Sequence, residues 1–281
     1  GFILLSVTTS LPELSVSIVA SLSGEGGLAV GNVLGSNIAN LTIILGLAIL
    51  IAGKTINVKG ESQKELVQFL FITSVIPLFI VQRGTLGTML GVILLILFVY
   101  FGVTISRKTE TNSNTNNTQE TPQPNKKENI PFTVIKFIAG VALIIFLSTV
   151  AVDSSTEIAE FIGLPSSIVG ATIIGLGTSL PELATTIQAL KQGLYSMALG
   201  NLLGSCIANI TLILGVSSLL STSEVNVVAV QSIMFYILLS SLTVWYMIGS
   251  NEKLTKRGAV FLCLIYAAFI LQQVGVSIVI F

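Results

Sequence analysis

The hydrophobic residues of this chain are gathered into long continuous runs, separated by mostly short polar connections. A run of about 20 apolar residues is long enough to cross a bilayer as a helix. Nine such runs can be placed along the 281 residues. The pattern therefore predicts an all-α polytopic membrane protein, with helices near residues 1–23, 27–52, 65–82, 85–106, 131–152, 165–190, 196–221, 226–248 and 258–280.

One longer polar connection, residues 108–129, interrupts this pattern. It is rich in Asn, Thr, Gln, Glu, Pro and Lys, and it has too few apolar side chains to fold alone. We therefore expect a flexible linker there. It would join a first membrane half, residues 1–107, to a second membrane half, residues 130–281.

The two halves carry the same pair of motifs. Thr-Ser-Leu-Pro-Glu-Leu begins at Thr9 and again at Thr178, and a Gly-Asn-x-Leu-Gly-Ser-x-Ile-Ala-Asn segment begins at Gly31 and again at Gly200. The offset is 169 residues throughout, and 22 of the 38 aligned positions from Thr9 to Gly46 are identical. Such internal symmetry in an apolar chain is typical of transporters built from structural repeats.

The basic residues predict the orientation of the helices. If successive connections alternate between the two sides of the membrane, eleven lysines and arginines fall on one side and only Arg83 on the other. An excess of Lys and Arg marks the cytoplasmic side. We therefore expect a multi-pass protein of the cell membrane, embedded in the lipid bilayer, with its basic loops, including residues 108–129, in the cytoplasm.

The helix that holds Glu13 and the helix that holds Glu182 are five steps apart, an odd number, so the two repeats run in opposite directions. The first half has four predicted helices and the second has five. The sequence thus predicts an inverted-repeat, five-plus-five helix transporter fold, with the first helix missing before Gly1.

The composition excludes several classes of function. Hydrophobic residues make up 52% of the chain and charged residues 9%, whereas soluble domains have about 25% charged residues. A net charge of zero gives no reason to expect nucleic acid binding, and nothing in the sequence implies a protein partner. The absence of histidine excludes a His-ligated metal site and a Ser-His-Asp triad. No nucleophile–base pair is visible, so we expect neither an enzyme nor a cofactor.

Two acidic residues stand out because they lie deep within apolar segments. Glu182 is nine residues from Lys191, or about 13 Å along a helix, which is near the middle of a hydrocarbon layer about 30 Å thick. Glu13 is its counterpart. A carboxylate at that depth is costly unless it is paired or binds a cation. No Lys or Arg is expected at the same depth, so the sequence predicts a bound cation.

The neighbouring residues supply further oxygen atoms. Pro12 and Pro181 cannot continue a helix from before them, so breaks are expected near residues 6–10 and 175–179. Such breaks free backbone carbonyls, which is tolerable at this depth only where they face a cavity or an ion. An i, i+4 stripe in each partner segment adds Asn32, Ser36, Asn40, Asn201, Ser205 and Asn209. An all-oxygen set suits Ca²⁺ or Na⁺.

Simpler interpretations of the same residues stay open. Ser-Leu-Pro-Glu also fits a capping box, in which the serine caps the helix and the glutamate reaches back. The Asn and Ser stripes can serve only to hold helices together. Gly31 with Gly35, and Gly200 with Gly204, fit close helix packing better than ion binding.

The two motif pairs resemble the alpha repeats of the calcium/cation antiporter superfamily, and within it those of the prokaryotic sodium/calcium exchangers. The resemblance covers nearly the whole chain and implies ten helices, the first absent here, around four clustered cation sites. The ligands that it implies are the carboxylates of Glu13 and Glu182, the hydroxyls of Ser10, Ser36, Ser179 and Ser205, the backbone carbonyls of Thr9, Thr178, Ser6 and Gly175, and the carboxamides of Asn40 and Asn209.

One departure from that family concerns charge. Members that couple calcium to sodium often have an aspartate at one of the last two positions, whereas both are asparagine here. Two carboxylates neutralise one Ca²⁺, and two protons would balance it equally well. The resemblance favours exchange of Ca²⁺ for Na⁺ by alternating access, and the two asparagines make a H⁺/Ca²⁺ exchanger the rival. A cation channel is a weaker third alternative, because broken helices in inverted repeats favour a transporter.

Overall fold

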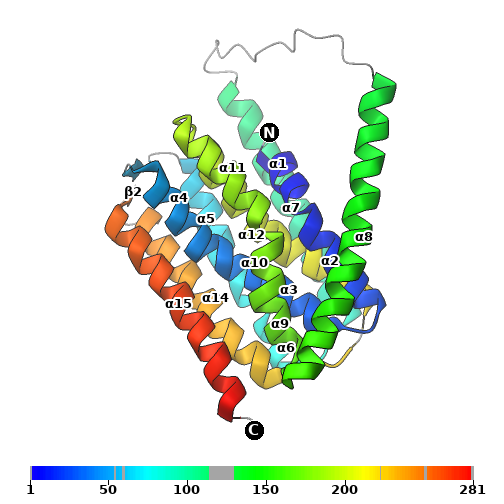
Figure 1. The fold of residues 1–281 in the computed structure, drawn as a ribbon. Coiled ribbons are helices and arrows are strands. Elements are labelled where there is room, and N and C mark those ends of the chain that lie inside the picture. Colours follow the sequence, from blue (N-terminus) through cyan, green and yellow to red (C-terminus); the bar gives the residue numbers. More distant parts are fainter. Residues whose placement is uncertain are drawn as a thin grey trace.

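The computed structural model describes residues 2–53, 55–58, 61–113, 130–221, 223–249 and 252–279. In these ranges the chain is a bundle of long helices (Figure 1). Seven of its helical spans are long and apolar enough to cross a membrane. They correspond to seven of the nine predicted segments. The remaining two, at 1–23 and 258–280, are helical as well, but each reaches residues outside the described ranges.

The first half contains the following elements, in chain order: α1 (Phe2–Thr9), α2 (Leu11–Leu22), α3 (Gly26–Ala39), the π-helical turn η1 (Asn40–Ile44), α4 (Leu45–Ala52), β1 (Ile56–Asn57), α5 (Glu61–Val75), α6 (Leu78–Arg83) and α7 (Thr88–Ser113).

The second half contains α8 (Ile130–Ile162), α9 (Ser166–Val169), the π-helical turn η2 (Gly170–Ile174), α10 (Gly175–Thr178), α11 (Leu180–Lys191), α12 (Tyr195–Ala208), the π-helical turn η3 (Asn209–Ile213), α13 (Leu214–Leu220), α14 (Val227–Gly249), β2 (Lys253–Leu254) and α15 (Lys256–Val279).

Both motif helices are interrupted at the serine of the motif. In the first half α1 ends before Ser10 and α2 begins after it, and in the second half Ser179 separates α10 from α11. A proline at the start of each following helix explains the interruption, because proline lacks the N–H that would continue the preceding turn. The breaks expected near residues 6–10 and 175–179 are confirmed.

The predicted start of the linker, residue 108, falls within the last part of helix α7. Helix α7 continues to Ser113 and so includes residues 108–113, which were expected to be flexible. Extending an existing helix is much easier than nucleating one, so polar residues can follow an apolar span in helical form. The rest of the predicted linker, residues 114–129, lies outside the described residues. The predicted first residue of the second half, 130, is also the first residue of α8.

Two short β contacts modify the expected all-α fold. Strand β1 pairs antiparallel with β2, with Ile56 opposite Leu254. An isolated antiparallel bridge joins Thr85 to Glu224, and the N–H of Val225 donates to the carbonyl of Gly84 at 2.9 Å. The 169-residue offset relates Ile56 to Val225 and Thr85 to Leu254. The two contacts are therefore counterparts, and each ties a loop of one half to a loop of the other.

The helices of the two halves also pack against one another reciprocally. Helix α3 packs along α9, η2 and α10, and its counterpart α12 packs along α1. In the same way α3 meets α14 and α12 meets α5, while α4 meets α15 and α13 meets α7. The apolar core is accordingly shared between the halves, with residues such as Leu34, Leu203 and Ile207 in one continuous cluster.

Glycines allow the closest of these contacts. A Cβ atom added to Gly35 would collide with the backbone of Ala171, and one added to Gly31 would collide with the backbone of Ser167. The packing role proposed for these two glycines is confirmed. In the second half, a Cβ at Gly204 would meet the side chain of Ser6.

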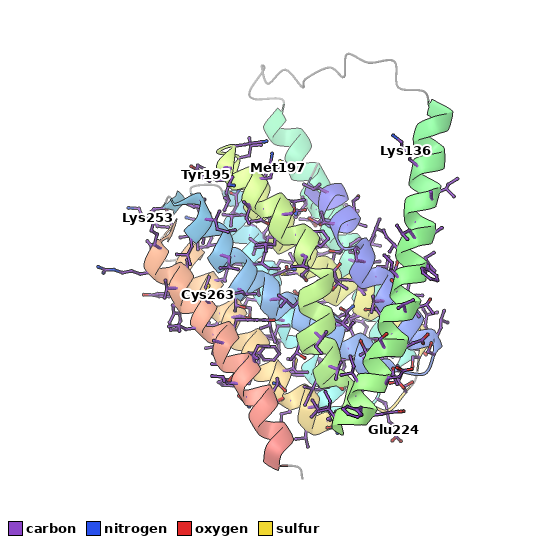
Figure 2. All side chains as sticks on the ribbon, viewed as in Figure 1. Lys136, Tyr195, Met197, Glu224, Lys253 and Cys263 are labelled. Carbon is purple, nitrogen blue, oxygen red and sulfur yellow. The ribbon has the colours of Figure 1, made fainter. Side chains whose placement is uncertain are left out.

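Charged residues mark the two ends of the bundle. In Figure 2, Lys136 and Lys253 lie toward the upper end of the view, and Glu224 lies at the lower end. This arrangement agrees with the predicted separation of basic and acidic loops.

Candidate cation-binding site

Two carboxylates lie in the interior of the bundle. Glu13 is in the first turn of α2 and Glu182 is in the first turn of α11, and both side chains are 0% exposed. The positive end of a helix dipole favours a negative charge at these positions. Within the described residues neither carboxylate has an ion-pair partner; the salt bridge found there joins Lys64 to Glu252. Because both carboxylates are buried, their negative charges would repel each other strongly when both are ionised.

Each carboxylate receives a hydroxyl from the opposite half of the chain. Ser179 Oγ donates to Glu13 Oε1 at 3.1 Å, and Ser10 Oγ donates to Glu182 Oε1 at 3.3 Å. Neither serine caps its own helix through its side chain, so the alternative capping-box interpretation is not observed. A hydrogen bond to a charged acceptor is stronger than one to a neutral group, which favours the contact between halves.

A strip of polar groups joins α3 to α10. Ser36 Oγ donates to the carbonyl of Gly175 at 3.1 Å and lies 3.4 Å from Thr178 Oγ1. Thr178 Oγ1 also donates to Asn32 Oδ1 at 3.2 Å, and its side chain interacts with the carboxylate of Glu13. Four predicted site residues of this half-site therefore lie together.

A matching strip joins α12 to α1. Ser205 Oγ donates to the carbonyl of Ser6 at 3.4 Å and lies 3.3 Å from Thr9 Oγ1. The side chains of Thr9, Ser10 and Ser205 all interact with the carboxylate of Glu182. The offset of 169 relates each member of this strip to a member of the first. The backbone carbonyls of Ser6 and Gly175 are thus held next to the two carboxylates by side chains of the other half.

Asn40 and Asn209 occupy the first positions of the π-helical turns η1 and η3. Both side chains are 0% exposed. The buried thiol of Cys206 lies near the side chain of Asn40 and near both carboxylates, so these groups belong to the same region. π-helical turns are frequent at functional sites, and neither turn was predicted from the sequence.

Four buried oxygen atoms of the predicted ligands have no hydrogen-bond partner within the described residues. They are one carboxylate oxygen, Oε2, of each glutamate, and the side-chain oxygen, Oδ1, of Asn40 and Asn209. A buried acceptor without a partner costs about 1–3 kcal/mol, and more if charged. Such atoms are the hard ligands that Ca²⁺ and Na⁺ prefer. Within the described residues, no three His, Cys, Asp or Glu side chains gather as a metal cluster.

Two further asparagines lie beside the site, and neither was among the predicted ligands. Asn32 Nδ2 donates to Ser17 Oγ at 2.9 Å and to the carbonyl of Glu13 at 3.1 Å, so it holds α2 against α3, as the simpler interpretation of the stripe suggested. Asn37, which was not predicted, accepts a hydrogen bond from Asn209. One feature of the sequence could have drawn attention to Asn37: it aligns with Cys206, and this is one of the few motif positions at which the two repeats differ.

Comparison with known proteins shows the family of the chain. The model of the family described as "Sodium/calcium exchanger protein" matches residues 1–106 and 132–275. The chain belongs to this family. As a sodium/calcium exchanger family member it is a multi-pass membrane transporter and not an enzyme.

Relatives of this exchanger-family chain cover most of its length. It is 34% identical to the Inner membrane protein YrbG of Escherichia coli (strain K12), over 82% of this chain and 71% of that protein. It is 30% identical to the Sodium/calcium exchanger MaX1 of Methanosarcina acetivorans, over 96% of this chain and 87% of that protein.

Solved structures show the same fold. The sodium-calcium exchanger NCX_Mj, soaked with Na⁺ and Sr²⁺, has a TM-score of 0.64 at 26% identity, over 95% of this chain and 84% of that one. A H⁺/Ca²⁺ exchanger, CAX, has a TM-score of 0.71 at 18% identity, over 98% of this chain and 76% of that one.

Proposed function

We propose that the chain is a secondary antiporter that exchanges Ca²⁺ for Na⁺ across the membrane by alternating access. One observation carries this proposal. Glu13 and Glu182 come from opposite halves, are fully buried, and each accept a hydroxyl from the other half, while their remaining oxygens have no partner within the described residues. A cation between them would satisfy both carboxylates at once. The relatives named as sodium/calcium exchangers support the choice of ions.

The ligands proposed for these ions are the twelve residues predicted from the sequence. The side chains are those of Glu13, Glu182, Ser10, Ser179, Ser36, Ser205, Asn40 and Asn209, and the backbone carbonyls are those of Thr9, Thr178, Ser6 and Gly175. The carbonyl of Ser6 accepts hydrogen bonds from Ser205 Oγ, Thr9 Oγ1 and the N–H of Ser10, and the carbonyl of Gly175 accepts one from Ser36 Oγ. These hydroxyls would have to rotate away before an ion could bind the two oxygens.

The charge of this site predicts an electroneutral exchange. Two carboxylates carry two negative charges, and the two asparagines add none. One Ca²⁺ would neutralise the site, as would two monovalent cations. Three Na⁺ would leave one uncompensated positive charge in a region of low dielectric, at a cost of several kcal/mol. We therefore propose that one Ca²⁺ exchanges for two monovalent ions.

The proposed architecture is a five-plus-five inverted repeat. The reciprocal contacts between α3 and α10, and between α12 and α1, are what a pseudo-two-fold axis in the membrane plane would produce. Helix α8 packs along α2. Helix α11 is the counterpart of α2 in the second half, and its residue Leu180 is 54% exposed. The basic end of the bundle would then face the cytoplasm.

A H⁺/Ca²⁺ exchanger is the second candidate function. The observation that favours it is the absence of a third carboxylate: with asparagine at both 40 and 209, protons on the two glutamates would discharge the site completely. A cation channel is disfavoured, because the carboxylates are enclosed by both halves rather than arranged along an open path.

The decisive experiment is Ca²⁺ uptake by proteoliposomes that contain the full chain. Vesicles loaded with Na⁺ and diluted into Na⁺-free medium should accumulate Ca²⁺ against its gradient. The rate should not change when the membrane potential is set with K⁺ and valinomycin. Uptake driven only by a pH gradient would favour H⁺ coupling, and uptake that never exceeds equilibrium would indicate a channel. No uptake under any gradient would refute the proposal.

A further inference from the structure

A groove lies between α14 and α15 at the basic end of the bundle. Its volume is about 860 Å³, and its lining includes Leu242, Trp245, Tyr246, Lys253 and Phe261. That volume is in the range of pockets that bind small molecules. The leucine and the three aromatic residues are between 39% and 57% exposed, so the groove opens toward the surrounding lipid and not toward the interior.

The aromatic wall of the groove begins at the depth of the membrane interface. Trp245, the one tryptophan of the chain, lies four residues before the end of α14 at Gly249, or about 6 Å along the helix. Tryptophan and tyrosine are enriched where the hydrocarbon layer meets the headgroups. The ring of Phe71 stacks on that of Trp245, with centroids 6.1 Å apart, and so holds the indole in place.

A glycine in the first turn of α15 keeps part of the groove open. A Cβ atom added to Gly258 would lie 3.0 Å from Cε of Met247, closer than such atoms usually approach. Both residues line the groove, so a larger side chain at position 258 would fill part of it.

The end of the groove at β2 and the start of α15 is positively charged. Lys253 lies there, where α15 begins (Figure 2). Lys253, Lys256 and Arg257 are all exposed, and none of them has an ion-pair partner within the described residues, where the neighbouring Glu252 is paired with Lys64. The positive end of the α15 dipole adds to this charge. Phosphate groups bind at helix N-termini and at clustered Lys and Arg.

The repeat symmetry does not account for these cations. The offset of 169 places uncharged residues at the three counterpart positions, which are Gly84, Gly87 and Thr88, and it places Ile76 at the position of Trp245. The orientation of the protein requires basic residues on this side of the membrane, but it does not require them beside an aromatic groove. The combination therefore indicates a ligand.

Charge selects the occupant. A second copy of the chain, in a two-fold contact, would bring the same three cations toward this groove, and like-charge repulsion would oppose it. The bilayer supplies molecules that combine a phosphate with acyl chains. We propose that the groove binds one anionic phospholipid, with its phosphate at Lys253 and the first turn of α15 and an acyl chain along Trp245 and Phe261. This inference does not depend on which ions the protein exchanges.

The test uses Trp245 as the reporter, because it is the one tryptophan of the chain and lines the groove. The full chain is placed in two sets of bilayers with the same amounts of phosphatidylcholine and phosphatidylglycerol. Brominated acyl chains, which quench indole fluorescence at short range, are carried by the phosphatidylglycerol in one set and by the phosphatidylcholine in the other. We expect phosphatidylglycerol to be preferred about fivefold at Trp245, which corresponds to about 1 kcal/mol, the magnitude expected for one basic residue near a membrane surface.

Variants separate the groove from the general charge of this end of the protein. Lys253→Gln should remove most of the preference, and Lys256→Gln/Arg257→Gln should do the same and decides the matter if Lys253→Gln fails to fold. Lys191→Gln is the matched control, because it removes an exposed cation at the end of α11, outside the groove. It should keep the preference. Gly258→Leu should lose the preference although every cation is present, because its side chain fills part of the groove.

Three results would overturn the proposal. The first is equal quenching in the two sets of bilayers, or an equal loss of preference in Lys191→Gln and Lys253→Gln. The second is weak quenching in both sets, which would mean that a second copy covers Trp245. The third is loss of the preference when inorganic phosphate is added, which would indicate a site for free phosphate. The fluorescence does not depend on transport, so a parent protein without Ca²⁺ uptake would refute the proposed function and leave this comparison intact.

Discussion

Replacing Glu13 by glutamine is the most direct test of the ion site. Glutamine has nearly the same shape, and its Oε1 can still accept the hydroxyl of Ser179, as Glu13 Oε1 does at 3.1 Å. The NH₂ group then takes the place of Oε2, the carboxylate oxygen that has no partner within the described residues. The substitution therefore keeps the contact between the halves and changes only the atom that faces the ion.

The magnitude follows from the charge that is lost. With one carboxylate left, a bound Ca²⁺ keeps one uncompensated positive charge in a fully buried site. Removing one partner of a buried charged pair costs about 3–5 kcal/mol. At about 1.4 kcal/mol for each factor of ten, Ca²⁺ affinity should fall by two to almost four orders of magnitude. Glu182→Gln should behave alike, because Glu182 has the same burial and a matching serine.

The same substitution should stabilise the protein when no Ca²⁺ is bound, although it weakens Ca²⁺ binding. At a pH at which both buried carboxylates are ionised they repel each other in the absence of an ion, so glutamine at either position removes both this repulsion and a buried charge. The thermal unfolding temperature without Ca²⁺ should rise, and the increase that Ca²⁺ produces in the parent should disappear. A misfolded variant would show neither change.

The assay is uptake of radioactive Ca²⁺ into proteoliposomes at a Ca²⁺ concentration well below saturation, with thermal unfolding measured on the same preparations. Glu160→Gln is the matched control, because it removes a carboxylate from the exposed surface of α8. Uptake by that control should stay close to the parent's. Near-normal uptake by Glu13→Gln would refute the idea that the carboxylates bind the ion.

Three further predictions concern the surroundings of the carboxylates. Ser179→Ala should weaken Ca²⁺ binding about ten- to a hundredfold, since a hydrogen bond to a charged group is worth about 1.5–3 kcal/mol; titration of the Ca²⁺-dependent unfolding temperature measures this, and an unchanged titration would contradict it. Gly35→Ala should reduce the folded yield in detergent, because its Cβ would meet the backbone of Ala171, whereas Gly140→Ala, with open space around it, should not. Ca²⁺ affinity should fall as the pH is lowered, because protons and Ca²⁺ compete for the same two buried glutamates; affinity that is constant with pH in equilibrium binding would argue against this competition.

The sequence predicted the membrane segments well because their signal is local. Runs of about 20 apolar residues and the prolines of the motifs act within their own helices. The breaks at Ser10 and Ser179 were found in this way. The extension of α7 to Ser113 was missed because composition does not show how far a stable helix continues into polar residues.

The partners of the site residues were harder to predict because they depend on the opposite half of the chain. The motif Ser-Leu-Pro-Glu favours a local capping box as much as a contact between halves. Only the packing of α1 along α12, and of α10 along α3, brings Ser10 to Glu182 and Ser179 to Glu13. Asn37 was missed for the same reason, because its two partners lie in the other half.

The reciprocal construction of the site gives a physical reason for coupled exchange. Glu13 and Glu182 are held by serines of opposite halves, so any movement of one half relative to the other changes the surroundings of both carboxylates. An empty site with both glutamates ionised would carry two like charges through the occluded state, at a cost of several kcal/mol per buried ion. A site that holds one Ca²⁺, or two monovalent cations, would be neutral and would avoid most of that cost. The proposed antiporter would therefore change conformation readily only when it is loaded, and obligatory exchange would follow from two buried charges and the symmetry that places them together.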